Sequence, residues 1–125
     1  MKKILIMSIL STIFGLLSCN AQSKKFESVD VATFAKVIAD TTVVLLDVRT
    51  PEEYEEAHIG NAINIDVLQD SFESKAISIL PKDKKIALYC RSGKRSKKAA
   101  KILAAKGYKI IELNTGYLGW IEAKK

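Results

Sequence analysis

The sequence predicts an α/β fold in which a parallel sheet carries helices on both faces. Short apolar runs of strand type alternate with segments whose apolar residues recur at helical spacing, a pattern typical of parallel α/β architecture. Two runs, Val43–Leu46 and Ile86–Tyr89, are apolar throughout, as expected of strands covered on both faces. Sites in such sheets form beyond the carboxyl ends of the strands, where this chain has Asp47 and Cys90.

The first half of the predicted domain has clear helix signals. Asp30 can cap a helix over residues 31–39, and the strand Val43–Leu46 follows it. Thr50 has the pattern of a second N-cap, because Pro51 stands in the first turn and Glu53 completes a capping box. The short run 63–65 is predicted as a strand.

The second half repeats the alternation around the segment after Tyr89. A helix over 72–80 closes at Pro81, and Gly107 is the expected C-cap of a helix that ends near Lys106. The remaining elements are a strand over 109–113 and a terminal turn or helix over 116–121, in which Trp120 packs on the core. Together these elements need one domain only.

Length, composition and charge agree with one domain that binds small anions. The 125 residues, 48% of them hydrophobic, suffice for a core of ordinary size. The formal charge is +6, and it becomes +4 (+6 − 2) if an N-terminal segment with Lys2 and Lys3 is removed. This excess suits small anions and an acidic membrane surface. Aromatic residues make up 7% and do not alternate with basic ones, which argues against nucleic-acid binding.

Residues 1–18 have the pattern of an export signal, with a positive start and an apolar run. The run is shorter than the about 20 residues of a comfortable membrane span. Leu16-Leu17-Ser18-Cys19 resembles a bacterial lipobox, so we expect cleavage before Cys19 and its lipidation. Residues 19–27 would form a polar tether and residues 28–125 the domain, anchored at the periplasmic side of a bacterial membrane. Cleavage after Ala21, giving a soluble periplasmic protein, is the alternative.

The segment Cys90–Ser96 joins an apolar strand to a helix through a tight loop that contains Gly93. Successive N–H groups of such a loop can converge on an anion, and the helix N-terminus adds positive potential at the same point. We expect Cys90 to lie at the rim of this anion site, in the thiolate form. Three basic residues add to the potential, namely Arg91, Lys94 and Arg95. The alternative is a small buried cysteine at a strand end.

Counting cysteines favours a chemical role for Cys90. The chain has two cysteines, and a lipidated Cys19 would leave Cys90 unable to form an internal disulfide. An unpaired thiol in an oxidising compartment is a liability unless it is used. One histidine, His58, with one spare cysteine does not make a metal site, so no metal or other cofactor is expected. The lysines that follow the loop, Lys97, Lys98 and Lys101, are expected to form a solvated helix face.

The loop Cys90-Arg91-Ser92-Gly93-Lys94-Arg95-Ser96 resembles the active-site loop of the single-domain rhodaneses, Cys-Arg-x-Gly-x-Arg followed by Ser. The upstream signature of that family also has counterparts, from Leu46-Asp47-Val48-Arg49 through His58-Ile59 to Asn64-Ile65. The resemblance covers residues 26–120. The chain departs from the family pattern outside the loop, at Ala57, Gly60-Asn61 and Thr115-Gly116.

This resemblance implies a rhodanese-like fold with a central parallel sheet of about four or five strands. It implies a sulfurtransferase that moves a sulfane sulfur from an anionic donor such as thiosulfate to a thiol, cyanide or protein acceptor, through a persulfide on Cys90. The donor would be bound by the loop residues Arg91, Ser92, Gly93, Lys94, Arg95 and Ser96. Asp47, Arg49 and Glu53 would support the loop as an ion-pair cluster in which Arg49 bridges the two carboxylates. His58 would be structural.

Two other functions stay open at this point. Phosphatases of related fold use a cysteine loop that is one residue longer, with arginine at the sixth position after the cysteine, where this chain has Ser96. The shorter ring suits a sulfur atom better than a phosphoryl group. A persulfide carrier or redox-sensing module with little turnover of its own would need the same nucleophile and the same loop.

Overall fold

The computed structural model describes residues 25–125, so the expected export signal and Cys19 lie outside the described residues. Five parallel strands form one sheet in the order β2-β6-β5-β3-β4. The strands are β2 (Glu27–Val29), β3 (Val44–Asp47), β4 (Ile63–Asn64), β5 (Ile86–Tyr89) and β6 (Ile110–Leu113). The helices are α1 (Val31–Ala39), α2 (Pro51–Glu56), α3 (Phe72–Ile79), α4 (Lys94–Ala105) and α5 (Gly116–Ala123). The predicted α/β class is confirmed.

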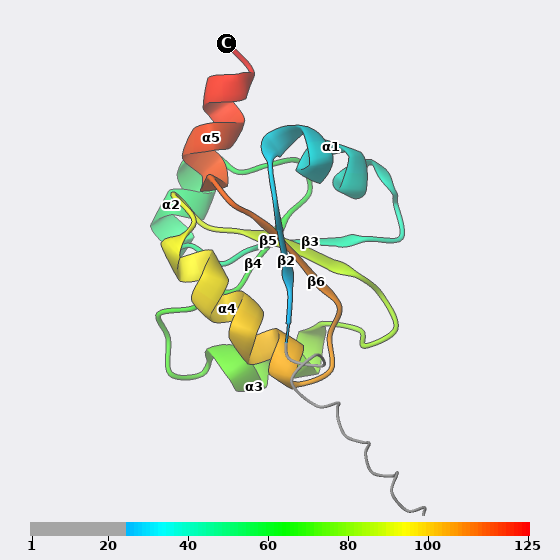
Figure 1. Cartoon of the computed structure of the whole chain (residues 1–125). Coiled ribbons are helices and arrows are strands. Elements are labelled where there is room, and N and C mark those ends of the chain that lie inside the picture. The colour runs from blue at the N-terminus through cyan, green and yellow to red at the C-terminus, as the bar shows by residue number, and fades with distance from the viewer. Residues whose placement is uncertain (1–24) are drawn as a thin grey trace, which may run out of the picture.

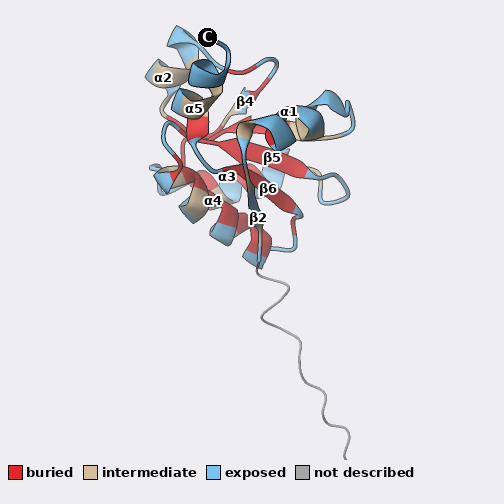
Figure 2. Cartoon of the chain, turned by 45° about the horizontal axis from the view of Figure 1, so that its top comes forward, coloured by how far each residue is buried: buried red, intermediate tan, exposed pale blue. Residues whose placement is uncertain are grey.

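The helices cover the sheet in two layers (Figure 1). Helices α3 and α4 pack on one face, while α1, α2 and α5 contribute side chains to the cluster on the other. Because successive residues of a strand point to opposite faces, each central strand supplies both layers. Figure 2 shows the result, with the central strands buried and the outer surfaces of the helices exposed.

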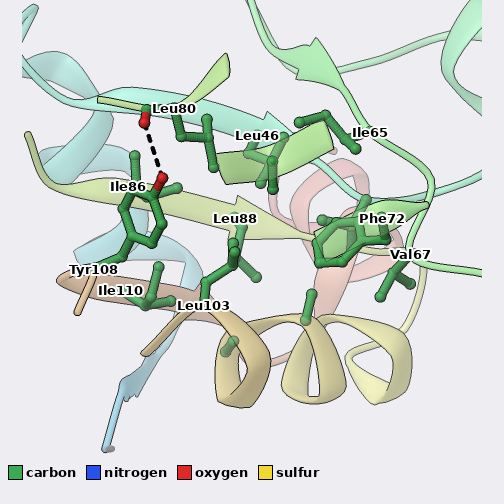
Figure 3. Close-up of a cluster of buried hydrophobic side chains, with 14 of the residues drawn as sticks. Leu46, Ile65, Val67, Phe72, Leu80, Ile86, Leu88, Leu103, Tyr108 and Ile110 are labelled. Carbon is green, nitrogen blue, oxygen red and sulfur yellow. Dashed lines mark hydrogen bonds between the residues drawn. The ribbon is translucent and has the colours of Figure 1, made fainter. Parts of the chain in front are cut away.

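A cluster of buried apolar side chains lies under α3 and α4 (Figure 3). Leu46 and Leu88 from the central strands face Leu103 of α4. The Tyr108 hydroxyl, which would otherwise be an unpaired donor in this core, donates to the Leu80 carbonyl oxygen at 2.9 Å. This layer fixes α4 on the sheet, and α4 begins directly after the loop with Cys90.

The helix signals of the sequence are confirmed at atomic level. The Asp30 side chain accepts from the Thr33 N–H at 2.9 Å and caps α1. At α2 both halves of the Thr50 and Glu53 capping box are formed. Helix α4 ends one residue before Lys106, and Gly107 adopts a positive φ of 96° just beyond.

One strand was missed, and the predicted tether extended into the domain as a result. Glu27, expected to end the tether, pairs with Ile111 in strand β2, and Phe26 packs against the core. Strand β2 has the sequence Glu-Ser-Val and lies at the edge of the sheet, so it carries no apolar run that a pattern could detect. Among residues 25–125, no helix combines the length and the apolar character that crossing a membrane requires.

Candidate active site

The loop that joins β5 to α4 has a shape that only glycine permits at Gly93. Gly93 has a φ of 107°, and a Cβ at this position would lie 2.1 Å from the Asn114 carbonyl oxygen. The first turn of α5 holds the loop from the other side. The Tyr117 N–H donates to the Cys90 carbonyl at 2.8 Å, and the Leu118 N–H to that of Arg91 at 3.0 Å. Strand β5, α4 and α5 therefore all position Cys90.

The Cys90 side chain is buried, with 1% of its surface exposed, where the sequence predicted a place at the rim. The side chain belongs to the buried cluster that residues of β5 and α4 form on this face of the sheet. The Gly93 N–H donates to Cys90 Sγ at 3.1 Å, and Sγ lies 3.3 Å from Ser96 Oγ. The sulfur thus faces one loop amide and one hydroxyl at the start of α4, and this polar setting argues against a purely hydrophobic cysteine.

The basic residues of the loop divide into two kinds. Arg91 and Lys94 are exposed and form no ion pair within residues 25–125, and Ser92 beside them is exposed too. Arg95 instead forms a bidentate pair with Glu53 of α2, at 2.8 Å and 3.0 Å. This pair ties the first turn of α4 to α2. The Arg95 hydrogen bond is the main cause that lowers the pKa of Glu53 to about 2.

Asp47 and Arg49 form a separate, buried pair, so the predicted bridge from Arg49 to both carboxylates is wrong. Arg49 donates to Asp47 through Nε at 3.0 Å and Nη2 at 2.7 Å, and its guanidinium lies 4.6 Å from the ring centroid of Tyr117. Glu53 is instead held by Arg95, because α2 turns its side chain toward α4. Burial opposes the positive charge, but the hydrogen bonds and the charge of Asp47 raise the pKa of Arg49.

The most informative group that sequence reasoning missed is Glu112, a fully buried carboxylate in β6. Its Oε2 accepts a hydrogen bond from the Ser96 hydroxyl and lies 3.2 Å from Lys97 Nζ. Its Oε1 accepts from the Ser28 hydroxyl of β2 at 2.6 Å. Lys97 therefore forms an ion pair with Glu112, which corrects the expectation of a fully solvated side chain. An acidic residue in an otherwise apolar strand was the available signal.

A cleft of about 300 Å³ lies beside the loop, between α2 and α5. It is lined by Arg49, Glu53, Glu56, Ala57, Arg91, Tyr117, Leu118 and Ile121. His58 lies apart from the thiol's partners, since its ring stacks on Tyr54 and its Nδ1 lies 2.8 Å from the Tyr54 carbonyl oxygen. Within residues 25–125, no group of three or more His, Cys, Asp or Glu side chains could hold a metal ion.

Comparison with known proteins gives one consistent family. A family model described as "Rhodanese-like domain" matches residues 30–123. A sulfurtransferase of Allochromatium vinosum is 33% identical over 94 residues, which cover 74% of this chain and 85% of the relative. The thiosulfate sulfurtransferase PspE of Escherichia coli is 38% identical over 73 residues, 58% of this chain and 68% of the relative.

Longer proteins and solved structures match as well. A tRNA uridine(34) hydroxylase of Pelagibacter ubique is 33% identical over 107 residues, which cover 85% of this chain but only 36% of the relative's length. The crystal structure of a rhodanese-related protein from Thermoplasma volcanium has a TM-score of 0.69 at 34% identity, over 78% of this chain and 93% of that one. The same fold therefore occurs both alone and as a part of larger proteins.

Proposed function

Because the chain belongs to the family of rhodanese-like domains, which includes sulfurtransferases, we propose that it transfers sulfane sulfur through a persulfide on Cys90. The observation that carries the proposal is the position of Sγ, at the end of β5 and 3.1 Å from the Gly93 amide at the start of α4. An amide donor and a helix N-terminus both stabilise negative charge on sulfur.

The reaction has two steps that use the same sulfur atom. The Cys90 thiolate attacks the outer sulfur of thiosulfate, the S–S bond of thiosulfate breaks, and sulfite leaves with the bonding electrons. Cys90 is then a persulfide anion, which has the same charge as the thiolate it replaces. A thiophilic acceptor, cyanide in an assay or a thiol or protein in the cell, attacks the terminal sulfur and regenerates the thiolate.

Two positively charged side chains on the loop support the proposal that the sulfur donor is an anion. Arg91 and Lys94 are exposed on the loop, and Arg91 also lines the cleft beside it. Long-range attraction to a dianion needs charges that are not neutralised by a partner, which favours these two over Arg95. We assign Arg95, with Glu53, to holding α4 against α2, and the Asp47–Arg49 pair to support beneath the loop. Thiosulfate is also the donor in the name of the Escherichia coli relative.

The test is the intact mass of the protein after incubation with thiosulfate. We expect one added sulfur atom in the wild type, release of sulfite, and thiocyanate after cyanide is added. Cys90→Ser, which changes one atom of the side chain, is the matched control and is expected to gain no sulfur. Thiocyanate formation by Cys90→Ser at a rate near that of the wild type would overturn the assignment of Cys90.

The same experiment separates an enzyme from a carrier. A protein that gains sulfur but releases it to neither cyanide nor small thiols would be a persulfide carrier, and repeated turnover contradicts that alternative. Hydrolysis of a phenyl phosphate by the wild type, with no gain of sulfur, would instead favour a phosphatase.

We also propose that the protein is exported and anchored by lipid on Cys19, which rests on the lipobox-like sequence alone. Expression of the full chain in a bacterium followed by membrane extraction tests this. We expect an N-terminal peptide that begins at an acylated Cys19. The Cys19→Ser variant should then be absent from the membrane fraction. A soluble protein that begins after Ala21 would contradict the lipid anchor while leaving export intact.

A further inference from the structure

The buried carboxylate of Glu112 is connected to the reactive sulfur through one hydroxyl. Glu112 lies opposite Ser28 of β2 in the parallel register, and on the same face of β6 as Ile110, which points toward α4. Its carboxylate therefore lies under the first turn of α4, where Ser96 is fully buried. The Ser96 hydroxyl contacts both Glu112 Oε2 and, at 3.3 Å, Cys90 Sγ.

The directions of these hydrogen bonds follow from counting protons. An ionised carboxylate can only accept, so Ser96 must donate its single proton to Glu112. The Ser96 oxygen is then left as an acceptor toward sulfur, so its 3.3 Å contact with Cys90 Sγ is a hydrogen bond when Cys90 is a thiol. A thiolate at Cys90 would need the Ser96 proton, and Ser96 can supply it only if Glu112 returns one.

We propose that Glu112 accepts the Cys90 proton through the Ser96 hydroxyl when the nucleophile forms. The S–H bond breaks as its proton moves to Ser96 Oγ, and the original Ser96 proton moves to Glu112 Oε2. The products are a thiolate, an intact serine and a carboxylic acid, so no proton leaves the protein. Glu112 is a positioning residue in this relay, and the inference rests on the proposed sulfur-transfer function of Cys90.

The relay avoids two buried negative charges at neighbouring sites. One negative charge moves from the carboxylate to the sulfur, where the Gly93 amide already donates. A charged group that contacts the relay is Lys97 of α4, at 3.2 Å from Glu112 Oε2. Arg95, the neighbour of Ser96 in the chain, is held by Glu53, and that hydrogen bond is the main cause that raises the pKa of Arg95. Lys97 also contacts the Gly93 carbonyl oxygen at 3.1 Å, so it remains near the site when Glu112 is neutral.

The test is the pH dependence of the first turnover with thiosulfate, in the full chain with Cys19→Ser so that Cys90 is the sole thiol. In the wild type the relay makes the rate of sulfur loading nearly independent of pH between about pH 6 and pH 8, because the proton is transferred internally. In Glu112→Gln the rate should rise roughly tenfold per pH unit over the same range, because the thiol must then lose its proton to solvent. At pH 6 the variant is expected to load sulfur about 100-fold more slowly than it does at pH 8.

Two serine variants provide the matched comparison. Ser96→Ala interrupts the relay and should show the same pH slope as Glu112→Gln, and the double variant should be no slower than either single one. Ser28→Ala removes a hydroxyl from the other oxygen of the same carboxylate and should keep the flat profile of the wild type. Thermal unfolding of each variant identifies loss of fold, and Ser96→Ala tests the relay if Glu112→Gln does not fold.

Several results would overturn the relay. A flat profile in Glu112→Gln would mean that Cys90 ionises without a proton acceptor, and a uniformly slower profile would mean that Glu112 only holds the loop in place. Faster loading by Glu112→Gln would mean that its charge merely opposes the thiolate. If the wild type takes up no sulfur, the proposed function fails, and the relay is then judged by the same pH slopes for alkylation of Cys90 with iodoacetamide.

Discussion

Two fully buried carboxylates lie on opposite faces of the sheet near the Cys90 loop, and their partners differ. Asp47 faces the α2 and α5 layer and meets a buried guanidinium, that of Arg49, together with the Tyr89 hydroxyl at 2.8 Å. Glu112 faces α4 and meets two hydroxyls and a lysine that is 40% exposed. Asp47 is held by a bidentate ion pair, whereas two of the partners of Glu112 are hydroxyls, which can both donate and accept a proton as the proposed relay requires.

The difference has a consequence for stability as well as for chemistry. Removing one member of a buried ion pair leaves the other charge without water or a partner, so the cost is high. The partners of Glu112 are less constrained, because the hydroxyl protons can rotate and Lys97 can reach solvent. We therefore expect a graded response when carboxylates near the loop are removed, set by the burial of the partner.

Asp47→Asn is expected to have the largest effect, about 3–5 kcal/mol in the free energy of unfolding, because Arg49 stays buried and charged. Urea unfolding followed by circular dichroism measures it. Adding Arg49→Met should recover part of the loss, since the unpaired cation is then gone. A loss below about 1 kcal/mol for Asp47→Asn would show that Arg49 finds another partner, and the contrast with Glu112 would fail.

Glu112→Ala should cost less, about 2–3 kcal/mol, through lost hydrogen bonds and the space left in β6. The same unfolding experiment applies. Ser28→Ala removes one of the hydroxyls that donate to Glu112 and should lower the free energy of unfolding by about 1 kcal/mol. This variant measures the contribution of a single hydrogen bond of the network. If Glu112→Ala were as destabilising as Asp47→Asn, its network would be as rigid as an ion pair, which the relay does not allow.

The two carboxylates also differ in how much of their role could be predicted from the sequence. The position of Asp47 at a strand end could be predicted because it follows a continuous apolar run. The strand-loop-helix pattern around Cys90 and Gly93 could be predicted in the same way. Glu112 could not be assigned a partner, since Ser28, Ser96 and Glu112 are brought together only by the register of β2 with β6 and the packing of α4. The choice of Arg95 over Arg49 as the partner of Glu53 likewise depends on how α2 approaches α4.

Glu53→Gln extends the comparison to a half-buried ion pair. We expect it to lower the free energy of unfolding by about 1 kcal/mol at neutral pH. The pKa of Glu53 is lowered from 4.5 to about 2, mainly by the Arg95 hydrogen bond, so folding favours the ionised form. This contribution is fully present above the unfolded value of 4.5 and is lost as the pH falls from there toward 2. Wild type and Glu53→Gln should therefore converge in unfolding free energy over this range, and a difference that stays constant would contradict the ion pair.

Glu73→Gln is expected to have the smallest effect, at most about 0.5 kcal/mol, and anchors the lower end of the series. Glu73 of α3 and Lys106 at the end of α4 form a pair at 3.0 Å, but both side chains are nearly half exposed. Water solvates either charge when its partner is removed, and salt screens their attraction. The difference in unfolding free energy between wild type and Glu73→Gln should be small without added salt and should approach zero when salt is added. A loss comparable to that of Glu53→Gln would mean that burial of the partner does not set the cost of removing these carboxylates, and the smaller cost expected for Glu112 than for Asp47 would then need another cause.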